Sequence, residues 1–244
     1  MSDFTYIKSN LDRVRQRLLA AAARGGHPMP RLIAVTKSAG DCEVEALLGY
    51  GIDAIAENRP QMFAAREAIL ARLNAERAGA GDALLATEMH LIGHLQTNKA
   101  KLVVGRAASI QSLDSERLAL EIEKQAAARG IVQPVLIEIN SAEEEQKGGI
   151  LPGEALAFAE WLTALPHLAV RGLMTIGPVL AVQEEYRPYF ASTRHLADTL
   201  AGSGLLPSRY TLSMGMSDSF EVAAEEGATE VRVGRTLFQR TEQK

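Results

Sequence analysis

Eight short apolar runs, each followed by a stretch with helical periodicity, recur along almost the whole chain of 244 residues. Runs of this composition are typical of parallel strands that are buried on both faces by helices. Eight such units in a chain of this length favour a closed (β/α)8 TIM-type barrel, an α/β fold, over an open doubly wound sheet. The runs lie at 31–37, 53–58, 88–94, 109–114, 134–140, 169–177, 210–215 and 230–234.

Helix signals fit the same plan. An extra N-terminal helix is predicted over about 3–24, ahead of the first strand. Asp41 is predicted to cap the helix after that strand, and Ser115 to cap a strongly amphipathic helix. The stretch 76–87 has the weakest pattern and is predicted to be a surface loop. No linker rich in Gly, Ser or Pro interrupts the chain, so residues 1–244 are predicted to form one domain.

Composition excludes several classes of protein. The net charge of -4, without a basic stripe, argues against nucleic-acid binding. No apolar run reaches the roughly 18 residues that span a bilayer, and the N-terminal segment MSDFTYIKSN has no signal core, so we expect a cytoplasmic protein. Cys42 is the one cysteine, which excludes an intrachain disulfide. His90 and His94 lie in a predicted strand, not on a helix face, and we expect no metal.

Lys37 ends the otherwise apolar first strand, at the mouth where barrels of this kind carry their active groups. An amine in such a place is expected to be partly desolvated, which lowers its pKa and makes it a nucleophile toward aldehydes. The alternative is a lysine that simply extends its charged end into water. Position alone leaves both interpretations open.

The last strand suggests an anion site at the same mouth. Gly234 and Thr236 lie between that strand and a short helix, where backbone N–H groups can approach a phosphate, and Ser213 adds a hydroxyl from the seventh strand. Arg232 shares the strand face of Gly234. A lysine and a phosphate site in one mouth are what pyridoxal 5'-phosphate (PLP) requires. A tight turn at Gly234 and an ordinary salt bridge at Arg232 remain the alternatives.

Several segments together carry a resemblance to a known family. They are LIAVTK, AENRPQ, HLIGHLQTNKAK, VLIEIN, GLMTIG and LSMGMSDSFEVAAEEGATEVRVGRTLF, in this order. From about residue 5 to residue 240 the chain resembles the YggS/PROSC family of PLP homeostasis proteins. The resemblance implies a barrel like the N-terminal domain of bacterial alanine racemase.

The resemblance also implies roles for individual residues. It places PLP as a Schiff base on Lys37, Asn58 near the cofactor ring, Ser213, Gly234 and Thr236 at the phosphate, and Arg232 facing the pyridine nitrogen. It implies a protein of vitamin B6 homeostasis that binds and delivers PLP, with PLP-dependent apoenzymes as acceptors and without established turnover. It further suggests that a lysine in the loop after the fifth strand, here Lys147, takes part in PLP exchange.

Some positions depart from the family pattern. Ser38, Ala39 and Gly40 follow Lys37, where members of the family commonly have a Thr-Lys-Pro-like segment. Arg235 occupies a position where the family often has a small, polar residue.

The rival function is an amino-acid racemase of fold type III. Because such racemases carry a second β-domain and little chain follows Arg235, we expect a non-catalytic PLP carrier. We also expect a monomer.

Overall fold

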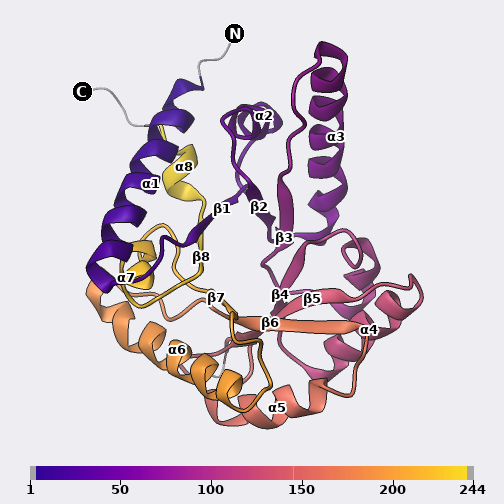
Figure 1. Ribbon diagram of the computed structural model, residues 1–244, viewed down its shortest axis with the longest axis vertical. Coiled ribbons are helices and arrows are strands. Elements are labelled where there is room, and N and C mark those ends of the chain that lie inside the picture. The colour runs from indigo at the N-terminus through magenta and orange to yellow at the C-terminus, as the bar shows by residue number, and fades with distance from the viewer. Residues whose placement is uncertain (1–3, 145, 241–244) are drawn as a thin grey trace.

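The computed structural model describes residues 4–144 and 146–240, and its strands close into a barrel (Figure 1). All neighbouring strands are parallel, each strand pairs with the next along the chain, and β8 closes the ring on β1. The predicted (β/α)8 architecture is therefore confirmed. The strands are β1 Arg31–Val35, β2 Ala54–Glu57, β3 Glu88–Leu91, β4 Ser109–Leu113, β5 Gln133–Ile139, β6 Leu168–Thr175, β7 Thr211–Ser213 and β8 Glu230–Val233.

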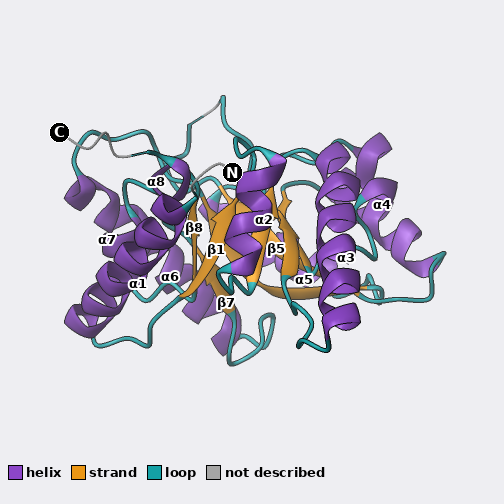
Figure 2. Ribbon diagram, turned by 90° about the horizontal axis from the view of Figure 1, so that it is seen from above, coloured by secondary structure: helices purple, strands orange, loops and turns teal. Residues whose placement is uncertain are grey.

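The strands lie in the middle of the molecule, with helices to the left, to the right and in front of them in the view of Figure 2. The α-helices are α1 Thr5–Gly25, α2 Asp41–Gly49, α3 Phe63–Ala80, α4 Glu116–Ala127, α5 Ala155–Leu162, α6 Arg187–Gly202, α7 Phe220–Glu225 and α8 Arg235–Phe238. Short 3₁₀ turns are η1 Pro60–Met62, η2 Thr97–Leu102, η3 Pro152–Glu154 and η4 Gln183–Tyr186. The third unit thus has a 3₁₀ turn in place of the expected α-helix.

The predicted extra helix is present as α1, and it lies beside α8 (Figure 1). Its buried Asn10 donates hydrogen bonds from Nδ2 to the carbonyl oxygens of Leu237 and Gln239, at 3.1 and 3.0 Å. These bonds tie the start of the chain to the segment that follows the last strand. Among the described residues, no helix has the length and apolar character needed to cross a bilayer.

Two local predictions were wrong, one of them only in part. The helix α3 continues through 76–80, where we expected the loop to begin, because Ala, Glu and Arg are good helix formers; residues 81–87 form the loop. It ends at Gly81, whose φ of 77° is left-handed and costs glycine little. Asp41 is the first residue of α2 and does not cap it; the N-cap is Gly40. The predicted cap at Ser115 is confirmed, since its side chain accepts a hydrogen bond from the Leu118 N–H.

Strand alternation separates the inside of the barrel from its outer wall. Ile33, Ala54 and Ala56 pack inside as a small cluster, whereas Ala34 and Ile55 belong to the large core between strands and helices. Because side chains alternate along a strand, the odd-numbered residues of β1 that follow Ile33 point toward the inside and the mouth of the barrel. The even-numbered residues of β1 face the helices.

Candidate functional site

Lys37, Arg232 and Gly234 line one cavity of about 230 Å³ at the mouth of the barrel. They come from the ends of β1 and β8, which are paired neighbours although about 200 positions apart in sequence. The other lining residues are Val35, Ile92, Met216, Ser217, Asp218 and Arg235. The structure thus brings together three of the residues that the sequence analysis selected.

Lys37 lies in a tight turn directly after β1. The Ala39 N–H donates to the Thr36 carbonyl oxygen at 3.0 Å, and Lys37 and Ser38 are the two central residues of that turn. The Lys37 side chain is exposed. The partial desolvation that the apolar strand led us to expect is therefore absent here, because the strand ends before the lysine. Its amine is free to meet an aldehyde that enters the cavity.

Arg232 is buried inside the barrel below this cavity. Its Nη1 donates to Ser213 Oγ at 2.7 Å, and its Nη2 donates to the Thr175 carbonyl oxygen at 2.8 Å. Burial lowers the pKa of Arg232 to about 10, against the raising effect of the carboxylates of Glu138 and Glu230. The guanidinium therefore stays charged near neutral pH and is held in one orientation.

Ser213 does not line the cavity. It is fully buried, and its hydroxyl accepts from Arg232 and donates to Gln111 Oε1 at 2.7 Å. Gln111 in turn donates to Glu230 Oε2 at 2.8 Å, so a chain of polar side chains runs across the inside of the barrel. The expected place of Ser213 at a phosphate is not seen, because its hydroxyl is used within this chain. The cavity instead has Ser217 among its lining residues.

Gly234 precedes α8 and lies against the end of β1. A Cβ at this position would stand 3.0 Å from the Val35 carbonyl oxygen and 3.1 Å from Val35 Cβ. The Thr236 N–H points to Ser217 Oγ at 3.4 Å, a long contact. Arg235 forms an exposed ion pair with Asp218 at the rim. The first N–H groups of a helix have no carbonyl partner in that helix, which suits an anion above Gly234.

Asn58 follows β2 and borders a second, more open cavity of about 520 Å³. This cavity is also lined by Arg59, Pro60, Gln61, Met62, His94, Gln96 and Lys99. Asn58 Oδ1 is buried and has no hydrogen-bond partner among the described residues. A buried polar atom without a partner is costly, so the position fits a group that receives a ligand.

Glu138 is a candidate site residue that the sequence analysis missed. It lies on β5, where burial and then the nearby Asp114 carboxylate raise its pKa to about 7, while Arg232 and His94 act in the opposite direction. Its signal in the sequence was an acid at one position of the apolar run VLIEIN. Perturbed acids of this kind gather at functional sites.

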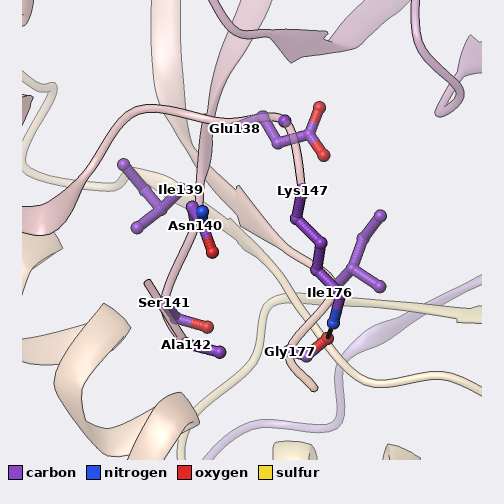
Figure 3. A pocket seen from close by; sticks show the side chains of 9 residues that line it. Glu138, Ile139, Asn140, Ser141, Ala142, Lys147, Ile176 and Gly177 are labelled. Atoms are coloured by element: carbon purple, nitrogen blue, oxygen red, sulfur yellow. Dashed lines mark hydrogen bonds between the residues drawn. The ribbon is translucent and has the colours of Figure 1, made fainter. Parts of the chain in front are cut away.

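Glu138 and Lys147 line a third cavity of about 170 Å³ between the loops after β5 and β6 (Figure 3). Lys147 Nζ donates to Glu144 Oε1 at 2.8 Å and to the Gly177 carbonyl oxygen at 3.0 Å. Asn140 closes the base of this loop, since its Nδ2 donates to the Glu144 carbonyl oxygen at 2.9 Å. The loop therefore holds Lys147 at the mouth.

Comparison with known proteins identifies the family of this chain. The family described as "Alanine racemase, N-terminal domain" matches residues 9–241. A pyridoxal phosphate homeostasis protein of Aquifex aeolicus is 40% identical over 230 residues, 93% of this chain and 95% of its own. The crystal structure of an unknown protein from Bifidobacterium adolescentis has 37% identity and a TM-score of 0.88, covering 98% of this chain and 97% of that one.

PipY of Synechococcus elongatus PCC7942, solved with PLP bound, has 29% identity and a TM-score of 0.79, and the match covers 96% of this chain and all of PipY, 100%. The resemblance seen in the sequence is therefore confirmed over nearly the whole chain. The chain belongs to the alanine racemase N-terminal domain family, among the pyridoxal phosphate homeostasis proteins.

Proposed function

We propose that this chain binds PLP as a Schiff base on Lys37 and holds it for PLP homeostasis. The observation that carries the proposal is the cavity shared by Lys37, Arg232 and Gly234. The names of the relatives and the PLP-bound PipY structure support it. When bound, PLP supplies an aldehyde that reacts with amines and a ring that withdraws electrons.

Each residue has a distinct part in this proposal. Lys37 provides the amine, and Gly234 and Thr236 provide the backbone approach to the phosphate. Asn58, which lines the second cavity at the end of the adjoining strand β2, provides a polar contact to the ring from that side. Arg232 faces the pyridine nitrogen; because a guanidinium only donates hydrogen bonds, it keeps that nitrogen unprotonated. Ser213 acts one step behind the ring, by holding Arg232. An unprotonated ring is a weaker electron sink, which suits holding the cofactor.

The test combines visible absorbance with covalent trapping of the cofactor. The purified protein should be yellow with PLP, and borohydride reduction should fix the cofactor on Lys37, as seen by mass spectrometry. Lys37→Ala should abolish the visible band, while Lys8→Ala on the exposed face of α1 should leave it unchanged. A Lys37→Ala protein that keeps the parent's visible band and affinity would refute the assignment.

The rival racemase function is tested with the same protein. Racemisation needs an acid–base group on each face of the substrate α-carbon, and Lys37 supplies one. We expect incubation with L-amino acids to give no multiple turnovers to D-amino acids or α-keto acids. Turnovers that disappear in Lys37→Ala would establish an enzyme and overturn the carrier proposal.

The proposal extends to the setting of the protein. We place it in the cytoplasm as a single-domain monomer that delivers PLP to PLP-dependent apoenzymes. The word homeostasis in the names of the relatives supports delivery rather than turnover. Delivery is tested by mixing the yellow protein with an apoenzyme and following the gain of enzyme activity. The reference is the gain of activity with free PLP at the same concentration. Activation no faster than with free PLP would contradict delivery.

A further inference from the structure

A group of hydrogen-bonded side chains lies behind the turn that carries Lys37, on the outer side of the barrel wall. It consists of the buried Thr36, Glu57 and Arg66 and the exposed Asp41, which we call the Arg66 cluster. Arg66 extends from α3, and its side chain is only 2% exposed. Helices α2 and α3 are neighbours on this side of the molecule (Figure 1).

The guanidinium of Arg66 holds the turn at both of its ends. Its Nη2 donates to the Thr36 carbonyl oxygen at 3.2 Å and to the Ala39 carbonyl oxygen at 3.0 Å. Its Nη1 donates to Asp41 Oδ1, at the start of α2, at 2.7 Å. One planar group therefore fixes the first and last residues of the turn and the helix that follows.

Glu57 fixes the orientation of that guanidinium. Its Oε1 accepts from Arg66 Nε at 2.9 Å and from Thr36 Oγ1 at 2.6 Å. Both Glu57 and Arg66 are buried, so each charge depends on the other. Glu57 ends β2 immediately before Asn58, so the cluster joins the backbone at Lys37 to the backbone at Asn58.

We propose that Arg66 is a positioning residue for PLP binding: it preorganises the Thr36–Ala39 turn so that the amine of Lys37 is presented to the cavity. The inference rests on the proposed function of Lys37. If the turn is not held in advance, it must become ordered when PLP binds. The conformational free energy of ordering even one residue is about as large as that of a tenfold loss in affinity. A lysine cannot replace Arg66 fully, because Nε, Nη1 and Nη2 of the planar guanidinium contact Glu57, Asp41 and the turn separately, and a single ammonium nitrogen cannot reach all of them.

The experiment separates positioning from stability. Arg66→Met alone leaves the buried Glu57 carboxylate unpaired and endangers the fold. The double variant Glu57→Met/Arg66→Met removes both charges and keeps the volume, and Arg66→Lys keeps the pair with Glu57. The matched control is Arg72→Met, which removes a half-exposed arginine of the same helix that pairs with Glu45 of α2.

The first measurement needs no PLP. In the apoprotein, amide hydrogen exchange at Ala39 should be at least tenfold faster in the double variant than in the parent or Arg72→Met. Exchange at the parent rate would overturn the inference, whether or not Lys37 binds PLP. If the parent protein shows no visible band with PLP, the proposed function is overturned instead.

The second measurement uses PLP. The dissociation constant should rise at least tenfold in the double variant and by less in Arg66→Lys, and the pH midpoint of the visible band should shift in both. Arg72→Met should match the parent in both quantities. Binding within twofold of the parent in the double variant, with an unchanged pH midpoint, would also overturn the inference.

Discussion

The half-buried carboxyl of Glu138 offers the sharpest test of the polar interior of the barrel. Its pKa rises from 4.5 to about 7, first because burial disfavours the charged form and then because Asp114 lies nearby. A raised pKa means that the folded state binds this proton more tightly than the unfolded chain. Ionising Glu138 in the folded protein therefore costs stability, and Glu138→Gln removes that cost.

The sign and the size follow from the two pKa values. Below about pH 4.5 the carboxyl is protonated in both states and the cost is absent; it grows between about pH 4.5 and 7 and is complete above. Each pKa unit corresponds to about 1.4 kcal/mol, so the full cost is about 3 kcal/mol. Between about pH 5 and 8.5 we expect the stability of Glu138→Gln to increase relative to the parent by about 2–3 kcal/mol.

Urea unfolding of the PLP-free proteins at these two pH values measures the effect. Glu160→Gln, at an exposed position of α5, controls for the loss of one negative charge. The comparison uses the change with pH in the difference between variant and parent, so any constant effect of the amide cancels. A difference that stays within about 0.5 kcal/mol across the range, close to measurement error, would refute the account of Glu138 as a half-buried acid with a raised pKa.

Three further predictions concern the mouth of the barrel. Gly234→Val should weaken PLP binding at least tenfold in an absorbance titration, because branched carbons would fill the approach to the phosphate; parent-like affinity in a folded variant would remove Gly234 from the site. Gly93→Ala should lower stability by about 2 kcal/mol or more, because its Cβ would stand 2.3 Å from the Asn58 carbonyl oxygen, and an unchanged melting temperature would contradict this. In Lys37→Ala protein with excess PLP, borohydride reduction and mass spectrometry should find a minor adduct on Lys147, whose side chain is 31% exposed at the mouth; no adduct would favour a purely structural lysine.

The sequence by itself determined the eight strands, the helices between them except the one expected after β3, and the positions of Lys37 and Gly234 at strand ends. These features depend on local patterns, since a buried strand needs an unbroken apolar run and a turn needs residues that permit it. The resemblance to the family rested on the same contiguous segments. The end of α3 was missed for the opposite reason, because residues 76–80 form helix by propensity without any strong apolar periodicity.

Only the tertiary structure decided how residues from distant strands meet. Strand-end patterns predicted both Ser213 and Gly234 at the phosphate. In the structure, Ser213 is buried and accepts a hydrogen bond from Arg232, whereas Gly234 borders the cavity. Alternation along a strand fixes the face of the sheet on which each side chain lies. The position of that side chain along the barrel axis depends on how the strands are staggered around the ring. The position of Arg66 behind Lys37 likewise depends on how α3 packs beside α2, close enough for the Arg66 side chain to reach Thr36 and Glu57, which no local pattern encodes.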